Sequence, residues 1–304
     1  MVCDGSFLDE EKDEMNEADL SIQAYRNEKL KKGGAYYRKE AETRHFIRQT
    51  YEDKECGNID IYTFCLSEAA ERALPVIFDF HGGGMVLGFP EQDFFFAEKL
   101  AEACRSIVAV IDYPLAPEYR YPKAIHASYR LIRQFLEKEN IDRNNVFLVG
   151  HSAGSNICCG IIALAAQDQI RFNGFVSNYG LFSWELQDKP SIDTGKAISS
   201  DRMRQYFNWY FEDGNSALEE LASPLYGEVT GYPPTLMNCA GYDSLLKEEY
   251  EFHNLLVDQG VDTEFHVYED CRHGFTHPHL KEYSKKDAEL SFQRTADFIM
   301  RRIV

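Results

Sequence analysis

The stretch Asn144–Ala166, NNVFLVGHSAGSNICCGIIALAA, decides the fold. Its apolar run Val146–Val149 has the length and composition of a buried strand, and the apolar residues from Ala153 onward have those of a helix. The two are joined only by Gly150–Gly154, which has the pattern G-x-S-x-G. A strand that turns this sharply into a helix needs glycines on both sides of the central residue, because side chains there collide with neighbouring elements. The stretch therefore predicts a tight turn that presents the hydroxyl of Ser152 at the carboxyl end of a strand.

Apolar and β-branched runs alternate with helical patterns on both sides of this stretch. Strands are expected at about Arg44–Tyr51, Asn58–Cys65, Leu74–Phe80, Ile107–Tyr113, Val146–Val149, Gly174–Tyr179, Thr235–Ala240 and Thr263–Tyr268. Helices are expected at about residues 17–31, ending before Gly33-Gly34, and at Asp93–Cys104, Lys123–Glu139, Ala153–Ala166, Leu245–Asp258 and Asp287–Arg302. The first two strands follow one another directly, which predicts an antiparallel pair, and the later alternation predicts right-handed parallel crossovers. The expected architecture is an α/β fold with an eight-stranded, mostly parallel mixed sheet and helices on both faces.

One segment, Leu181–Tyr232, is longer than a crossover needs. Four aromatic residues gather in a helical pattern within it, namely Phe207, Trp209, Tyr210 and Phe211. A long insertion beside the carboxyl edge of a sheet usually forms a lid or cap, although an extra packing helix with no part in substrate binding is the alternative. Since the chain shows no repeat, low-complexity tract or flexible linker, we expect a single domain over residues 1–304 with an inserted cap.

Composition narrows the classes of partner. With 50 acidic against 32 basic residues, the formal net charge of −18 disfavours binding to nucleic acid or to anionic membrane surfaces. The acidic N-terminus lacks the basic-then-apolar order of a signal peptide, and no run approaches the roughly 18 apolar residues of a membrane span. Eight cysteines are scattered without metal-ligand spacing, which is typical of reduced thiols and predicts no metal site. These features together predict a cytoplasmic protein.

A glycine-rich loop, His81–Gly84, follows the strand that ends at Phe80. Successive glycines allow the backbone to turn its N–H groups toward a ligand. Together with the N–H of Ala153, one or two of the N–H groups of this loop would stabilise the negative oxygen that forms when an ester carbonyl is attacked. A flexible loop or a phosphate-binding turn is the alternative, but no Lys-Ser/Thr follows and no dinucleotide-binding pattern is completed. No cofactor is therefore expected.

A serine hydroxyl is a poor nucleophile until a base removes its proton. His273 follows the last expected strand, so it lies at the same sheet edge as Ser152. His277 and His279 are the main competitors for the role of base. His81 and His151 are held by their own turns and are not expected to face the serine.

The base in turn needs an acid that orients it. Asp243 follows the strand Thr235–Ala240 and so reaches the same edge. Asp270 is the alternative, but it is nearly adjacent to His273 in sequence and badly placed to reach its imidazole. The order Ser152, Asp243, His273 is the one expected of a catalytic triad built on an α/β sheet.

These motifs resemble the esterases of the hormone-sensitive-lipase type, a family with the α/β-hydrolase fold that includes bacterial acetyl and short-chain esterases. The resemblance covers the chain from about Leu74 to the C-terminus. It is carried by His81–Gly84, Asp112–Glu118, Gly150–Gly154, Ser223–Leu225, Tyr232–Pro234, Gly241–Asp243 with Leu245, and His273–Phe275.

The resemblance implies a triad of Ser152, Asp243 and His273, an oxyanion hole of Gly83, Gly84 and Ala153, and a helical cap formed by about residues 1–42 and 182–232. Three positions depart from it: His151 stands where the family often has Asp, Ser155 where it often has Gly, and Met85 where it often has an aromatic residue. Such departures are expected to reshape the acyl pocket without removing a catalytic group.

The implied function is that of a serine carboxylesterase which hydrolyses short-acyl esters through an acyl-enzyme intermediate. The expected partner is a small-molecule ester, with no nucleic acid, membrane, metal or cofactor, and the sequence predicts no oligomeric state. An amidase, peptidase or lactonase at the same site remains an alternative, although a peptidase would be expected to carry a further large domain. A non-catalytic ligand receptor on the same fold is the other alternative, and the presence of His273 disfavours it.

Overall fold

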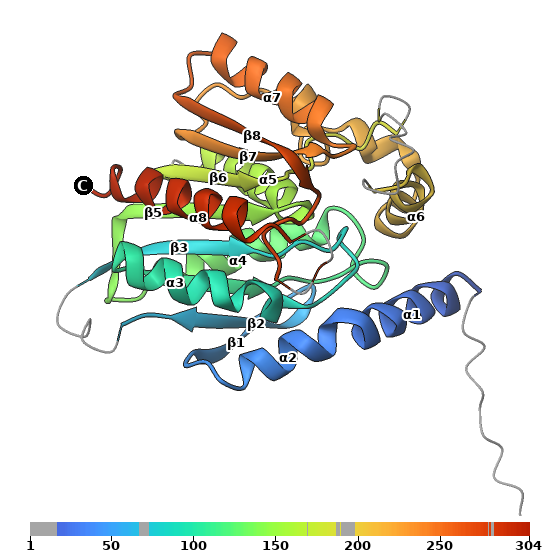
Figure 1. Cartoon of the computed structure of the whole chain (residues 1–304), viewed down its shortest axis with the longest axis horizontal. Helices are drawn as coiled ribbons and strands as arrows, with labels where there is room; N and C mark the ends of the chain where they lie inside the picture. The colour runs from blue at the N-terminus through green and yellow to red at the C-terminus, as the bar shows by residue number, and fades with distance from the viewer. Residues whose placement is uncertain are drawn as a thin grey trace, which may run out of the picture.

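One mixed sheet runs through the molecule (Figure 1). The computed structural model describes residues 17–66, 73–168, 170–186, 189, 198–278, 280 and 283–304. The eight strands are β1 (Ile47–Asp53), β2 (Gly57–Phe64), β3 (Leu74–Phe80), β4 (Ile107–Asp112), β5 (Ile141–His151), β6 (Gly174–Asn178), β7 (Thr235–Tyr242) and β8 (Thr263–Arg272). Their order across the sheet is β1-β2-β4-β3-β5-β6-β7-β8.

Strand directions follow the expected scheme. β1 pairs with β2, and β2 with β4, in antiparallel register, whereas every pairing from β4 through β3 and on to β8 is parallel. The predicted fold class is therefore confirmed. The largest difference is at β5, which begins at Ile141, because Ile141 already pairs with Leu74 of β3 and the polar residues between it and Val146 form an irregularity in the register.

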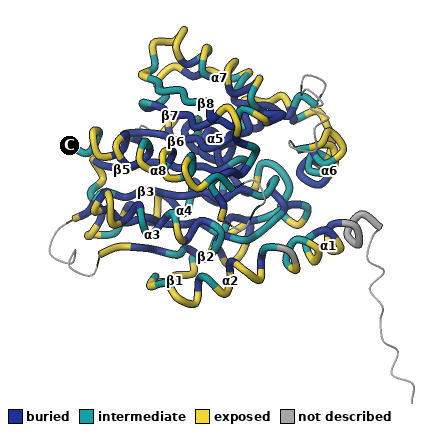
Figure 2. The backbone as a smooth tube through the Cα atoms, viewed as in Figure 1, coloured by how far each residue is buried: buried dark blue, intermediate teal, exposed yellow. Residues whose placement is uncertain are grey.

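Helices cover both faces of the sheet. α3 (Phe94–Cys104) and α8 (Lys285–Met300) lie on one face, and α4 (Lys123–Phe135) and α5 (Ala153–Gln167) lie on the other (Figure 1). α7 (Leu246–Asp258) packs beside β7 and β8 at the end of the sheet. Because successive side chains of a strand point to opposite faces, Ile77 joins the core under α3 and α8 while its neighbour Phe78 joins the core under α4 and α5. Figure 2 shows the result, with the central strands buried and the outer faces of the helices exposed.

The N-terminal helix does not stop where the sequence predicts. α1 (Glu17–Lys29) continues through a π-helical turn, η1 (Leu30–Gly34), into α2 (Ala35–Ala41), so the predicted end before Gly33-Gly34 is wrong. Gly34 keeps a helical φ of −59°. A Cβ at Gly34 would lie 2.7 Å from the ring of Phe89, so this glycine permits close packing and does not break the helix.

The long insertion contains one helix, α6 (Ser200–Tyr210), and short 3₁₀ turns at η4 (Gly214–Leu218) and η5 (Pro224–Tyr226), while η3 (Pro90–Asp93) precedes α3. The ring of Tyr25 in α1 stacks on Trp209 of α6 at 5.5 Å, and its hydroxyl lies 2.6 Å from that of Tyr206. α1 and α6, far apart in sequence, therefore pack together at the same end of the molecule (Figure 1).

That contact joins the two parts of the predicted cap, although residues 1–16, 187–188 and 190–197 of it lie outside the described residues, and its function stays a prediction. Tyr210 and Phe211 of the aromatic cluster are buried against Tyr121 and Trp184, so these rings pack the core. Within the described ranges, no helix is both long enough and apolar enough to cross a membrane.

Candidate active site

Ser152 occupies a strained turn between β5 and α5. Its backbone has φ 54° and ψ −117°, a left-handed conformation that non-glycine residues rarely adopt. A Cβ at Gly150 would lie 2.5 Å from the backbone nitrogen of Ser155, and one at Gly154 would lie 1.9 Å from the carbonyl oxygen of Phe80. Both flanking glycines are thus required by contact with backbone, as the sequence pattern predicts.

The structure brings Ser152, His273 and Asp243 together. Nε2 of His273 lies 2.8 Å from Oγ of Ser152, and Nδ1 lies 2.5 Å from Oδ2 of Asp243. The imidazole tautomer that donates Nδ1–H to the carboxylate leaves Nε2 free to accept the serine proton. This arrangement can transfer a proton from the serine hydroxyl to the imidazole while the carboxylate holds the ring.

Strand ends explain why these residues meet. β7 ends at Tyr242 and β8 at Arg272, so Asp243 and His273 are the first residues beyond two neighbouring parallel strands. Asp243 is buried, and the backbone N–H of Leu245 donates to its Oδ1 at 3.2 Å. The His273 side chain keeps 17% of its surface exposed, which leaves the ring accessible to a substrate.

The two competing residues that the structure describes, His277 and Asp270, make no hydrogen bond to Ser152 or His273. Nε2 of His277 faces the hydroxyl of Tyr179 at 3.3 Å, and burial lowers the pKa of His277 to about 3. Asp270 is exposed within β8, and His279 lies outside the described residues.

The loop after β3 lies against the serine. A Cβ at Gly82 would be 3.3 Å from Cβ of Ser152, and Gly83 and Gly84 have φ values of 136° and 61°. Among the described residues, no protein acceptor takes the backbone N–H of Gly83 or of Gly84. These two N–H groups therefore remain available to a ligand beside the serine.

Two residues that the sequence did not single out hold this loop. The ring of Tyr206 in α6 is so close to Gly84 that a Cβ there would lie 2.7 Å from it. Arg26 of α1 donates from Nε to the carbonyl of Val86 at 2.8 Å and from Nη2 to that of Ala116 at 2.7 Å, and it pairs with Glu118. Neither position carries a motif, because each acts through a contact between segments that are distant in sequence.

A second histidine–carboxylate group lies beside the turn. Nε2 of His151 is 3.4 Å from Oδ1 of Asp79, and Asp93 completes a buried cluster. Burial alone would lower the pKa of His151, but the carboxylates of Asp93 and Asp79 outweigh burial and raise that pKa to about 9. The two carboxylates thus create a field that favours positive charge at this place.

This second group does not form a serine relay. Ser155 lies in α5, three residues after Ser152. Its hydroxyl donates to the carbonyl of Gly150 at 2.9 Å and accepts from the hydroxyl of Ser177 at 3.0 Å. Within the described residues, no hydrogen bond joins His151 to Ser155 or to Ser152.

Residues 77–277 match the model of a protein family with the alpha/beta hydrolase fold. The chain belongs to this family. Similar α/β hydrolases include an esterase of Acinetobacter venetianus, 28% identical over 207 residues, which are 66% of this chain and 67% of that protein. An arylesterase of Saccharolobus solfataricus is 26% identical over 195 residues, which are 62% of this chain and 64% of that protein. The matches thus span about two thirds of these relatives' lengths or slightly less. The esterase-type resemblance carried by the motifs is confirmed.

Solved α/β-hydrolase structures agree in fold. An esterase of Pyrobaculum calidifontis superimposes with a TM-score of 0.81 over 92% of this chain and 93% of that one, at 24% identity. A structure described as a bacterial heroin esterase gives the same TM-score over 94% of this chain and 93% of that one, at 20% identity. At such identities the likeness shows the fold alone.

Proposed function

We propose that this α/β hydrolase cleaves carboxylic esters by two-step acyl transfer, with Ser152 as nucleophile, His273 as general base and acid, and Asp243 as the group that orients the imidazole. The observation that carries the proposal is the pair of hydrogen bonds from His273, one to the serine hydroxyl and one to the buried carboxylate. The relatives named esterase and arylesterase support the choice of ester substrates.

The first half-reaction transfers the acyl group to the enzyme. Oγ of Ser152 attacks the ester carbonyl carbon while its proton passes to Nε2 of His273. The carbonyl oxygen becomes an oxyanion, which accepts hydrogen bonds from the backbone N–H groups of Gly83, Gly84 and Ala153. Collapse of this intermediate breaks the bond to the alcohol oxygen, and His273 returns the proton to the departing alcohol.

The second half-reaction releases the acid. A water molecule attacks the acyl-enzyme carbonyl, giving its proton to His273, and the same N–H groups hold the second oxyanion. Collapse breaks the bond to Oγ, and the proton returns to Ser152. The balance is one ester and one water consumed for one acid and one alcohol formed.

Short acyl chains are the proposed substrates. The ring of Tyr206 lies directly over Gly84, so an aromatic wall stands beside the proposed oxyanion hole. Its hydroxyl contact with Tyr25 fixes that wall to α1, and Arg26 ties α1 to the loop, which supports a capping role for both segments. The cytoplasmic location stays a prediction from the sequence.

A series of p-nitrophenyl esters from acetate to laurate tests this function. The protein is expected to show its highest kcat/KM at acetate or butyrate, and Tyr206→Ala to shift the maximum toward longer chains. Tyr206→Phe is the matched control, because it keeps the ring and removes only the hydroxyl contact. A maximum at laurate in the unmutated protein would contradict the short-acyl proposal, and turnover of p-nitroanilides with no ester turnover would contradict the ester class.

A further inference from the structure

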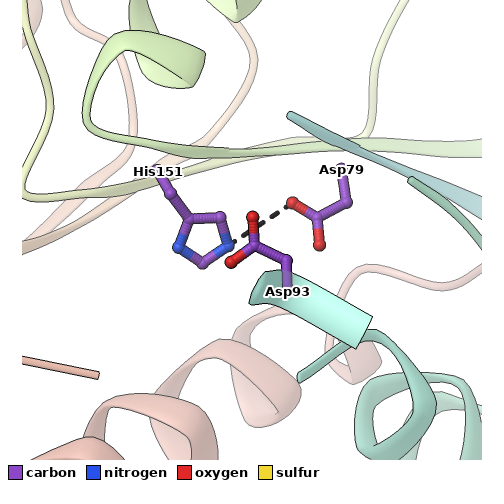
Figure 3. Close-up of side chains that lie close together, drawn as sticks. All are labelled: Asp79, Asp93 and His151. Atoms are coloured by element: carbon purple, nitrogen blue, oxygen red, sulfur yellow. Dashed lines mark ion pairs between the residues drawn. The ribbon is translucent and has the colours of Figure 1, made fainter. Parts of the chain in front are cut away.

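Three ionisable side chains meet in the interior next to the proposed nucleophile. Asp79 lies near the end of β3, Asp93 at the junction of η3 and α3, and His151 at the end of β5. Figure 3 shows their side chains pointing toward one another. None exposes more than 1% of its surface, and one ligand atom from each lies within 4.8 Å of the other two.

The polar atoms of this cluster lack hydrogen-bond partners. Both carboxylate oxygens of Asp79, both of Asp93, and Nε2 of His151 are buried, and no other atom of the described residues hydrogen-bonds to them. Buried carboxylates without partners are strongly destabilising, so such groups are normally paired or bound to a metal. Two carboxylates and one imidazole nitrogen facing a single point therefore favour a positive charge there.

Two kinds of cation fit that point, a proton on Nε2 or a metal ion between the three groups. A charge-assisted N–H···O bond draws its atoms to about 2.7–2.9 Å. Here Nε2 of His151 and Oδ1 of Asp79 form an ion pair at 3.4 Å, which is longer than such a bond. Two ligands that each lie about 2.0–2.1 Å from a tetrahedral ion are about 3.4 Å apart, so the spacing fits the edge of a coordination polyhedron.

The surroundings also suit an ion. Nδ1 of His151 lies 3.3 Å from the hydroxyl of Tyr179, and metal-binding histidines commonly have such a partner on the second ring nitrogen. A cavity of about 50 Å³ borders Asp93, His151 and His277, which is enough for a water molecule as a further ligand. Nδ1 of His277 lies 3.9 Å from Oδ1 of Asp93 on the same side.

We propose that Asp79, Asp93 and His151 bind one divalent metal ion, and that the ion joins the strand before the glycine-rich loop to the turn that holds Ser152. An imidazole ligand beside two carboxylates favours Zn²⁺ over Mg²⁺ or Ca²⁺, which prefer oxygen ligands alone. The ion would connect β3, the start of α3 and the end of β5. It acts on structure, and no step of the proposed hydrolysis passes through it.

Metal content of the purified protein tests the site. The protein is prepared without a histidine tag and with Cys3→Ser and Cys65→Ser, since Cys65 is exposed and Cys3 lies outside the described residues, and thiols also bind zinc. After dialysis against a chelator and then against Zn²⁺, plasma mass spectrometry is expected to find about one equivalent of bound zinc. Zinc is also expected to raise Tm, and Co²⁺ in its place to give visible d–d absorption.

Substitutions locate the ion. Asp93→Asn and His151→Gln are each expected to weaken zinc binding at least tenfold, on the scale of about 10–100-fold for the loss of supporting groups at metal sites. Asp168→Asn is the matched control, because that carboxylate pairs with Arg133 far from the cluster, and it is expected to keep the full equivalent.

Two results would overturn the proposal. The first is that the protein with the cluster intact, although folded and reactive with a fluorophosphonate, binds no zinc or cobalt and keeps the same Tm in excess metal. Protons, and not a metal ion, would then balance the charge of the cluster. The other is full zinc content in both cluster variants. Neither result depends on ester turnover, so failure of this site and failure of the proposed hydrolase function are separable.

Discussion

Two histidine–carboxylate groups flank the same serine, and they differ in almost every physical respect. His273 and Asp243 are joined by a hydrogen bond of 2.5 Å, and the ring continues to Oγ of Ser152 at 2.8 Å. His151 and Asp79 are 3.4 Å apart without a hydrogen bond. The His273 side chain is partly exposed, whereas the side chain of His151 is closed to solvent.

The difference shows that residue types alone do not make a relay. His151 is the neighbour of Ser152 in the chain, yet its ring points to the face under α3, whereas His273 arrives from another strand end and meets the hydroxyl. Tyr179 lies between the groups, with its ring 5.2 Å from that of His273 and its hydroxyl 3.3 Å from Nδ1 of His151. We propose that the first group transfers a proton and that the second holds charge in the interior.

The largest difference in kcat is expected between substitutions of two nearby serines, Ser152 and Ser155. Ser152→Ala is expected to lower kcat for p-nitrophenyl acetate by about 10⁵–10⁶-fold, as removal of the nucleophile does in other serine hydrolases. Ser155→Ala removes a buried hydroxyl whose hydrogen bonds go to Gly150 and Ser177 and not to His273. The free energy of unfolding is therefore expected to fall by about 1 kcal/mol while kcat stays nearly unchanged. A comparable loss of kcat in both variants would mean that the relay has been misassigned.

The two aspartates give the next largest contrast. Asp243→Asn is expected to lower kcat by about 10⁴-fold, because the amide no longer fixes the imidazole tautomer that accepts the serine proton. Asp79→Asn is expected to act mainly on Tm and metal content, with a smaller effect on kcat per folded molecule. Steady-state kinetics beside thermal unfolding distinguishes the two, and the reverse ranking in kcat would exchange the roles assigned here.

Substitution in the glycine-rich loop, which lies against Ser152, is expected to have an intermediate effect on kcat. A Cβ at Gly83 would lie 2.7 Å from the carbonyl oxygen of Leu87, and its φ of 136° is unfavourable for alanine. Gly83→Ala is therefore expected to displace the oxyanion donors and to lower kcat by about 10²–10³-fold. Gly57→Ala is the control: its φ of 69° is also strained, but it is the first residue of β2, where the chain returns from β1, so stability should fall without loss of kcat.

Tyr179→Phe has the smallest expected effect and measures how far the groups are coupled. The change removes a hydroxyl that lies 2.5 Å from that of Thr276 and near His151, but it keeps the ring beside His273. Urea unfolding is expected to show a loss of about 1 kcal/mol, and kcat to fall by less than tenfold. A fall in kcat as large as that of Asp243→Asn would show that the two groups act as one network.

Much of the fold follows from local sequence. Buried strands such as Ile107–Asp112 are short apolar runs rich in β-branched residues, and their positions were predicted almost to the residue. The start of β5 was missed because Asp142–Asn145 are polar, and the pairing of Ile141 with Leu74 before this irregular stretch is not revealed by local patterning. The π-helical turn at Leu30–Gly34 was missed because Gly34 leaves room for the ring of Phe89, a contact that local sequence does not reveal.

The candidate site divides in the same way. That Ser152, Asp243 and His273 lie together could be predicted, because each directly follows a strand and the ends of parallel strands meet at one edge. Asp79, Asp93 and His151 have no ligand-like spacing, and two of them lie within strands, so only the folded structure brings them together. Tyr206 and Arg26 escaped prediction because their contacts join α6 and α1 to a loop distant in sequence.

Mapping the adduct of a fluorophosphonate tests the central claim most directly. The reagent modifies a serine hydroxyl only when a nearby base activates it. Intact mass and peptide mapping are expected to show one adduct, on Ser152, in the unmutated protein, and labelling slowed by several orders of magnitude in His273→Ala. An adduct on Ser155 or on another serine, or an equal labelling rate in His273→Ala, would contradict the account.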